Sequence, residues 1–185
     1  TETVTTEKTY KTSGTYADTI KWKYDEATST FIFEGTGEVR RSSGVIDSNE
    51  SSCVHIAENI RFEEGITDIE KHIVMMFDNA KTVYLPASYD GIIPEFLKIE
   101  KYIVSENNPK YSSDEYGILF NHDKTELIRF PKSSPIEIYE IPEGVLRIVS
   151  NAFDETENLK TVTVPESLEN ILRTIFKESS VLSKI

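Results

Sequence analysis

The sequence predicts a β-solenoid, a β-rich fold with short helical turns (α+β) in which units of about 23 residues stack on one another. The main observation is an internal repeat. Pro142 ends the segment EIYEIP, and Pro165 ends KTVTVP one period later. The longer segments PIEIYEIPEGVLRIVSNAF and NLKTVTVPESLENILRTIF also match in their apolar positions. A fixed period of this length is the signature of a repeat architecture.

The period extends to both sides of these two units. Pro86 ends KTVYLP, and Glu63, one period before it, ends ENIRFE. The segment SYDGIIPEFLK indicates a shortened unit, because Ser105 matches Pro86 before a full period is complete. At the C-terminus, Ile185 stands one period after Val162, so we expect the chain to stop inside the strand of a further unit.

Each unit is expected to contain one short strand with two distinct sides. Val162 and Val164 are predicted to point inward, whereas Thr161 and Thr163 point outward, because side chains alternate along a strand. Proline ends the strand because it has no N–H for the ladder. The segment RIVSNAF then predicts one helical turn that buries Phe153. Since no unit can bury its apolar side alone, stacked units share a core.

Three regions are expected along the chain: a flexible leader at 1–13, an N-terminal β cap with a connecting loop at 14–57, and the solenoid at 58–185. In the cap, IKWKYDEATSTFIFEGTGEV predicts a β-hairpin that covers the first unit. Near 112–135, strands at 117–120 and 126–130 around an NHDK tip indicate an inserted β-hairpin.

The charge of the chain disfavours two classes of partner. Lysine and arginine number 20 against 32 aspartate and glutamate residues, which gives a formal net charge of −12. Nucleic acid and anionic lipid are bound mainly through cationic contacts, so we expect neither as a partner; the acidity is also explained by solubility alone. No apolar run approaches the ~20 residues of a membrane helix, and the polar N-terminus does not resemble a signal peptide. Membrane insertion is therefore not expected.

No arrangement of residues indicates catalysis, a cofactor or a metal site. His55, His72 and His122 are scattered, and the single Cys53 cannot form an internal disulfide. Cys53 and His55 would share a face if their segment were a strand, but a catalytic pair also needs an orienting group and an oxyanion site. The glycines at 35–37 do not precede a helix, as a phosphate-binding loop requires. We predict no enzyme, and keep a hydrolase as the remote alternative.

Outward strand residues are expected to line up from unit to unit on the sheet face that solenoids commonly use for binding. This predicted binding face comprises Arg61, Tyr84, Lys101, Ile103, Ile138, Glu140, Thr161 and Thr163, with Asn59 and Thr82 in the same rows. Tyr84, Ile103 and Ile138 stand out, because exposed apolar or aromatic side chains mark contact patches. The alternative is that the inserted hairpin or a neighbouring molecule covers them.

The repeats VPESLENILRTIF and IPEGVLRIVSNAF resemble those of BspA-like bacterial leucine-rich-repeat proteins, whose units read roughly IPxxVxxIxxxAFxxCxxLxxV. The hairpin segment SENNPKYSSDEYGILFNHDKTELIRFP and the strand pair IKWKYDEATSTFIFEGTGEV are also similar to segments of that family. The resemblance covers the chain from about Gly14 onward. The usual cysteine of the repeat is replaced by Phe77, Thr156 and Ser179.

The resemblance implies a leucine-rich-repeat β-solenoid that is exported from a bacterium to the cell surface or the extracellular space. It also implies a non-enzymatic adhesion or interaction module for a protein or glycan, without a fixed binding motif. A different class of function is a structural spacer within a larger surface protein. The incomplete final unit favours this alternative, since an open repeat invites self-association.

Overall fold

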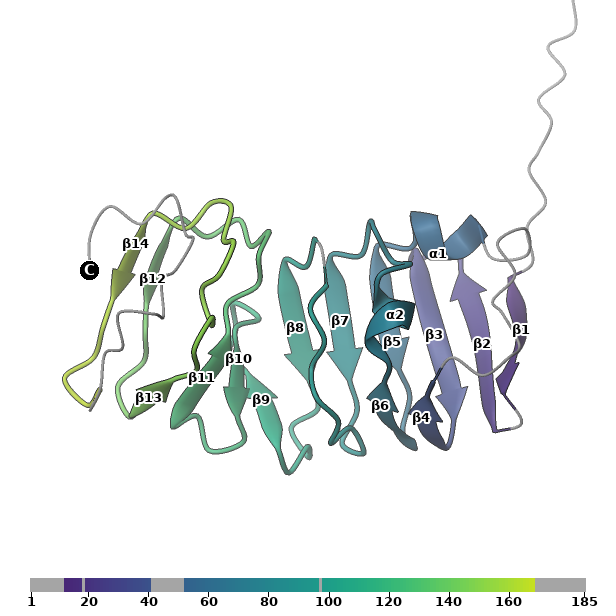
Figure 1. Cartoon of the computed structure of the whole chain (residues 1–185), viewed down its shortest axis with the longest axis horizontal. Coiled ribbons are helices and arrows are strands. Elements are labelled where there is room, and N and C mark those ends of the chain that lie inside the picture. Colours follow the sequence, from purple (N-terminus) through teal and green to yellow (C-terminus); the bar gives the residue numbers. More distant parts are fainter. Residues whose placement is uncertain (1–11, 18, 41–51, 97, 169–185) are drawn as a thin grey trace, which may run out of the picture.

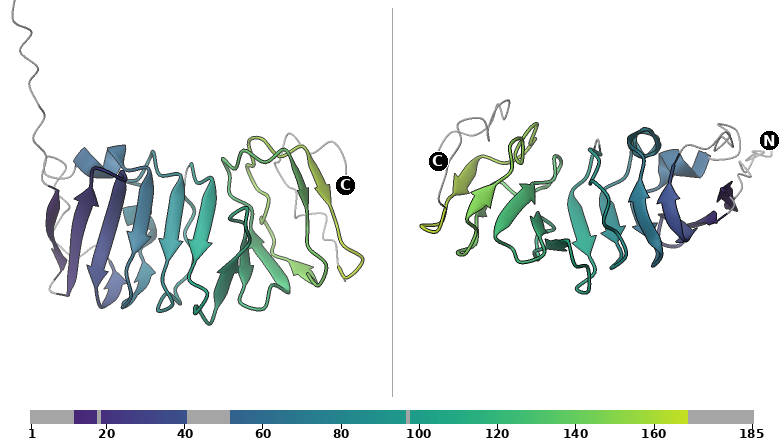
Figure 2. Two further views of the ribbon diagram at one scale, coloured as in Figure 1. Left: turned by 180° about the vertical axis from the view of Figure 1, so that it is seen from behind. Right: turned by 60° about the horizontal axis from the view of Figure 1, so that its bottom comes forward.

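The structure, a computed structural model, describes residues 12–17, 19–40, 52–96 and 98–168 (Figure 1). Most of the expected leader, the middle of the connecting loop and the further unit at the C-terminus lie outside these residues. Ser13, at the end of the expected leader, begins the first strand. The strands follow one another along the long axis of the molecule (Figure 2).

The main sheet contains six strands in the order β1-β2-β3-β5-β7-β8. Their bounds are Ser13–Ala17 for β1, Ile20–Asp25 for β2, Thr30–Gly35 for β3, Asn59–Phe62 for β5, Thr82–Leu85 for β7 and Lys101–Val104 for β8. The first three are antiparallel, and the pairs from β3 onward are parallel. Ile60 pairs with Val83, the partner that the repeat period aligns with it.

A second layer lies in front of this sheet in Figure 1. It contains the parallel pair β4 (Gly37–Val39) and β6 (Ile66–Ile69), and the short helix α2 (Lys71–Val74). A further helix, α1 (Ser52–Ile56), leads into β5. Figure 2 shows the six-stranded sheet from behind, on the face that this layer leaves uncovered.

The described residues of the C-terminal half form two smaller sheets. One has the order β13-β11-β10-β9, with bounds Tyr111–Ser113 for β9, Leu119–Asn121 for β10, Glu126–Arg129 for β11 and Arg147–Ile148 for β13. Strands β10 and β11 form the antiparallel hairpin expected around the NHDK tip. The other sheet pairs β12 (Ile138–Glu140) with β14 (Thr161–Thr163) in parallel, and Tyr139 lies opposite Val162.

The expectation of outward rows that continue from β8 to β12 is wrong, because the main sheet ends at β8. The inserted segment takes the free edge of β8: Tyr102 N–H donates to the Gly117 carbonyl over 3.0 Å, and Val104 N–H donates to Ser113 Oγ over 3.2 Å. An edge whose donors are already paired cannot accept another strand. The predicted binding face is therefore divided into two parts.

The apolar side chains of the described residues form two core clusters that follow this division. The first contains stacked rings from the hairpin and the first units, such as Phe33 against Phe62 at 5.4 Å between centroids. The second gathers around Phe153, which is fully buried and lies 5.5 Å from Phe130. The helical turn predicted from RIVSNAF is instead the short strand β13 followed by tight turns. Phe153 is nevertheless buried, because its side chain still points into the second core cluster.

Hydrogen bonds from side chains connect segments that lie 23 residues apart in the sequence. Ser88 Oγ accepts from Gly65 N–H and donates to the Ile66 carbonyl, both over 2.9 Å. Ser167 does the same in a later unit: it accepts from Gly144 N–H over 3.1 Å and donates to the Val145 carbonyl over 2.9 Å. Each hydroxyl satisfies a donor and an acceptor of the preceding turn, where the glycine has a positive φ.

Candidate functional site

The first part of the predicted binding face lies on β5, β7 and β8. Tyr84 pairs with Arg61 on one side and with Ile103 on the other. The guanidinium carbon of Arg61 lies 4.2 Å from the centroid of the Tyr84 ring, within cation–π range. The Ile103 side chain is 38% exposed, and Lys101 is exposed beside it. The structure therefore brings Arg61, Tyr84, Lys101 and Ile103 together.

Thr82 differs from the expectation that it points outward into solvent. Its side chain is buried, although it belongs to the outer row of β7. It is short, and its neighbours across the ladder, Asn59 and Lys101, carry longer side chains.

The second part of the predicted binding face lies on β12 and β14. Ile138 is opposite Thr161, and Glu140 is opposite Thr163. The Ile138 side chain is 70% exposed, which is unusual for a large apolar residue within a strand. Glu140 and Thr163 are also exposed, whereas Thr161 is half-buried.

The segment between β9 and β10 separates the two parts and is fixed to β12. Asp114 Oδ2 accepts a hydrogen bond from the Tyr139 hydroxyl over 2.7 Å, and its Oδ1 accepts from the N–H groups of Tyr116 and Ile118. Burial, together with the bond to Asp114, raises the pKa of the Tyr139 phenol above its ordinary value. The phenol therefore stays protonated and keeps donating to Asp114.

Between this segment and the β12–β14 pair lies a hollow of about 380 Å³, which we call the β12 hollow. Its apolar lining includes Ile138, with Ile136 and Val164 half-buried beneath. Tyr116 lines it too; its ring is 53% exposed and meets the Tyr139 ring edge-on at 6.1 Å. The exposed carboxylates of Glu115, Glu140 and Glu143 also line it.

Ile138, Glu140 and Thr163 of the predicted binding face line the β12 hollow, whereas Tyr116, Glu115 and Glu143 line it without having been predicted. Tyr116 and Glu115 lie in the DEYG turn that enters the hairpin, outside any strand row. An aromatic residue in an otherwise polar turn was the one available signal, because turns are dominated by small and polar residues.

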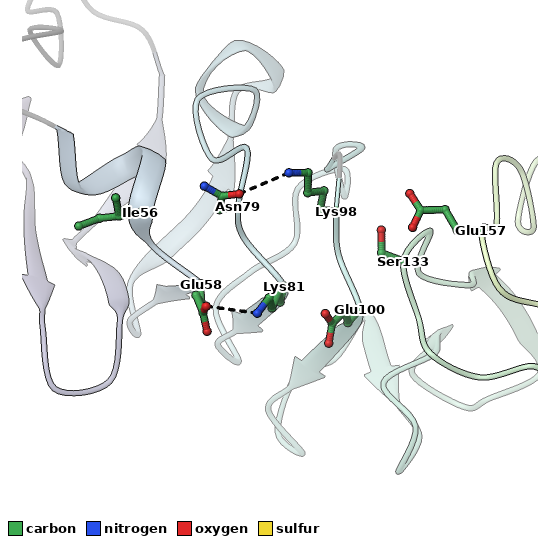
Figure 3. Close-up of a pocket in the computed structure, with 8 residues that line it drawn as sticks. All are labelled: Ile56, Glu58, Asn79, Lys81, Lys98, Glu100, Ser133 and Glu157. Atoms are coloured by element: carbon green, nitrogen blue, oxygen red, sulfur yellow. Dashed lines mark hydrogen bonds and ion pairs between the residues drawn. The ribbon is translucent and has the colours of Figure 1, made fainter.

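A second hollow, of about 630 Å³, lies at the other end of the strands (Figure 3). Its lining is mixed in charge and partly paired. Lys81 forms an ion pair with Glu58 at 3.2 Å, and Lys98 donates to Asn79 over 3.3 Å. None of the described residues that line it is aromatic, so it offers fewer specific contacts than the β12 hollow.

The histidines lie apart from one another. His55 contacts Asp78, His72 contacts Glu70, and His122 Nδ1 lies 2.7 Å from the Asn108 carbonyl. Within the described ranges no group of three or more histidine, cysteine or acidic residues could hold a metal ion. No helix in that part of the chain is long and apolar enough to cross a membrane.

Cys53 and His55 lie on helix α1, and so the strand geometry that would have placed them on one face does not apply. Residues two apart on a helix point to different sides. Burial raises the pKa of the Cys53 thiol, which therefore stays protonated and behaves as a small apolar residue.

Comparison with known proteins adds the family and the fold. Residues 124–185 match the family model described as BspA type leucine rich repeat region. A leucine-rich repeat protein from Eubacterium ventriosum is 17% identical, with a TM-score of 0.47, over 83% of this chain and 59% of that one. The pneumococcal vaccine antigen PcpA is 15% identical, with a TM-score of 0.52, over 94% of this chain and 70% of that one. No curated protein matches the sequence.

These comparisons agree with the strands described above in showing a β-rich, leucine-rich-repeat-like fold with few short helices. The chain spans less than two thirds of the Eubacterium protein. The resemblance seen in the repeats VPESLENILRTIF and IPEGVLRIVSNAF is confirmed: both lie within the segment that matches the BspA-type leucine-rich-repeat family.

Proposed function

We propose that this chain is a non-enzymatic binding module, exported to the bacterial surface or beyond, that holds a protein or glycan in the β12 hollow and on the adjoining sheet face. The observation that carries the proposal is the exposure of Ile138 and Tyr116 in one hollow. Large apolar side chains that remain exposed together in a concave site are typical of contact sites. Export and surface location are supported by the family to which the repeats belong.

We also propose the repeat length, the N-terminal cap and the division into cap region and solenoid. A unit of about 23 residues accounts for the strand pairs Ile60–Val83 and Tyr139–Val162. The β2–β3 hairpin, whose inner strand pairs with β5, acts as a cap that covers the first unit. Residues 14–57 and 58–185 would then be the cap region and the solenoid.

The test is a glycan-array and host-protein screen on the purified chain. Ile138→Glu places a charge in the β12 hollow, and Tyr84→Glu does the same on the first part of the face. The matched control is Ile92→Glu, because the Ile92 side chain is 81% exposed beside Pro94, away from both parts. We expect a specific partner that Ile138→Glu loses and Ile92→Glu retains. Binding that persists in both face variants would refute this site.

A structural spacer is the second candidate, and the ties between units favour it. The serine bonds and the ion pairs Lys81–Glu58 and Lys160–Glu137 all connect residues one unit apart, which suits a stiff rod. A screen in which no partner binds, with all proteins folded, would support the spacer. Light scattering would then measure whether copies of the chain associate with one another.

A further inference from the structure

The β12 hollow combines an apolar surface with an acidic rim. Its volume of about 380 Å³ falls within the roughly 300–1,000 Å³ of ordinary ligand pockets. Ile138 and Ile136 provide the apolar surface, and Glu115, Glu140 and Glu143 stand around it. No lysine or arginine is among the described residues that line it. The hollow is therefore complementary to a ligand that is both apolar along its length and positively charged at one end.

The rim carboxylates have no cationic partner of the kind that some acidic residues elsewhere on this surface have. Glu58 pairs with Lys81 at 3.2 Å, and Glu137 pairs with Lys160 at 2.7 Å. Across the described ranges of the chain, by contrast, no ion pair involves Glu115, Glu140 or Glu143. Three unneutralised carboxylates around one hollow produce a local negative potential that a cationic group of a ligand would relieve.

The Tyr116 ring favours a guanidinium over an ammonium as the cationic group of the ligand. Its edge-on contact with Tyr139 holds the ring beside the carboxylates, and Tyr139 is itself fixed by Asp114. An arginine guanidinium stacks on aromatic faces and bonds carboxylates with two parallel N–H groups, which an ammonium cannot do. The methylene stem of the same side chain can cover an apolar floor such as Ile138.

We infer that the β12 hollow binds an arginine side chain presented by an exposed segment of a partner protein. This inference rests on the proposed function and specifies its ligand, a basic protein segment and not a glycan. The net charge of −12 assists the encounter at long range, while the hollow supplies the specific contacts.

The probes are two short, end-capped, fluorescent peptides in which leucine alternates with arginine or with citrulline. Citrulline keeps the shape of arginine but lacks its charge. Binding of each peptide to the full chain is measured by anisotropy at low and at physiological ionic strength. The test variant is Glu115→Gln with Glu140→Gln. The control, Glu106→Gln with Glu157→Gln, makes the same charge change at exposed carboxylates outside the hollow.

We expect the arginine peptide to bind at least ~10-fold more tightly than the citrulline peptide. The affinity of the arginine peptide should be about 3- to 20-fold weaker for the hollow variant than for the native chain. For the control variant it should be weaker by less than about 2-fold. Added salt should weaken binding to the native chain more than binding to the hollow variant.

Three results would overturn the inference: equal binding of the two peptides, equal losses in the two variants, or no binding of the arginine peptide. Equal losses would mean that net charge alone attracts the peptide. The proposed function is judged separately, by the partner screen. A screened partner that Ile138→Glu loses, and that the glutamine variants retain, would leave the binding module in place and remove only its preference for arginine.

Discussion

The carbonyl oxygen of Gly117 accepts a hydrogen bond from the backbone N–H of Tyr102 over 3.0 Å, and this bond closes the edge of the six-stranded sheet. Gly117 has a φ of +81° and sits against the backbone of Lys101. A Cβ at this position would overlap the Cβ of Lys101 and lie 2.8 Å from its Cα. The glycine therefore allows the inserted segment to lie beside β8 and to separate the two parts of the predicted binding face.

Gly117→Ala should destabilise the protein by about 2–4 kcal/mol, since the overlap adds to the cost of a positive φ. Gly144→Ala is the matched control: its φ is also positive, at +93°, but no atom lies within 4 Å of a Cβ there. It should cost only about 1 kcal/mol. Urea unfolding measures both free energies. Equal costs would show that the close approach to Lys101 is not important.

The repeat register is the part of the fold that the sequence predicts best. Prolines one period apart align Tyr139 with Val162, and alternation predicts that both are buried, as the structure shows. The break after β8 could not be predicted, because it depends on whether the inserted segment or β12 occupies the edge of β8. Such a choice between distant partners leaves no periodic signal in a sequence.

Only part of the candidate site was predicted, because contacts between distant segments leave no periodic signal in the sequence. Ile138 and Glu140 follow from strand alternation, whereas Tyr116 reaches the hollow only because Asp114 holds its turn against Tyr139. His55 and Cys53 were expected to lie on one face only if their segment were a strand. The segment is a helix, so the two side chains do not lie together. The polarity pattern of such a short segment does not distinguish a helix from a strand.

Ser88→Ala tests the hydrogen bonds that connect neighbouring units. Removing the hydroxyl leaves Gly65 N–H and the Ile66 carbonyl without this partner, so we expect a loss of about 1–3 kcal/mol. Amide exchange at Gly65 should accelerate accordingly. Ser150→Ala, at an exposed position, should change the free energy of unfolding by less than about 0.5 kcal/mol. Unchanged exchange at Gly65 in Ser88→Ala would contradict the role of the hydroxyl.

Phe153→Ala should cost about 3–5 kcal/mol, because it empties the centre of the second core cluster. Leu146→Ala, at a position that is 40% exposed in the same unit, serves as the control and should cost much less. Thermal and chemical unfolding report the difference. Similar values for the two variants would mean that the second cluster is not a packed core.

Tyr139 should make stability depend on pH in the alkaline range. Burial and Asp114 raise its pKa in the folded state, so its contribution is fully present below the ordinary tyrosine value near 10 and is lost as pH rises above it. Tyr139→Phe should lower stability at neutral pH by about 1 kcal/mol and flatten the alkaline decline. The decline should persist in part, because burial also raises the pKa of Tyr102, to about 12. An unchanged pH profile would contradict this assignment.

The most direct test of the binding proposal is to titrate the ¹⁵N-labelled chain with a partner found in the screen and to map the amide shifts. We predict that the largest shifts cluster at Tyr116, Ile138 and Thr163, around the β12 hollow. Shifts confined to the rim at Lys81 and Glu100, the hollow in Figure 3, would contradict the central claim and place the binding site at the other end of the strands.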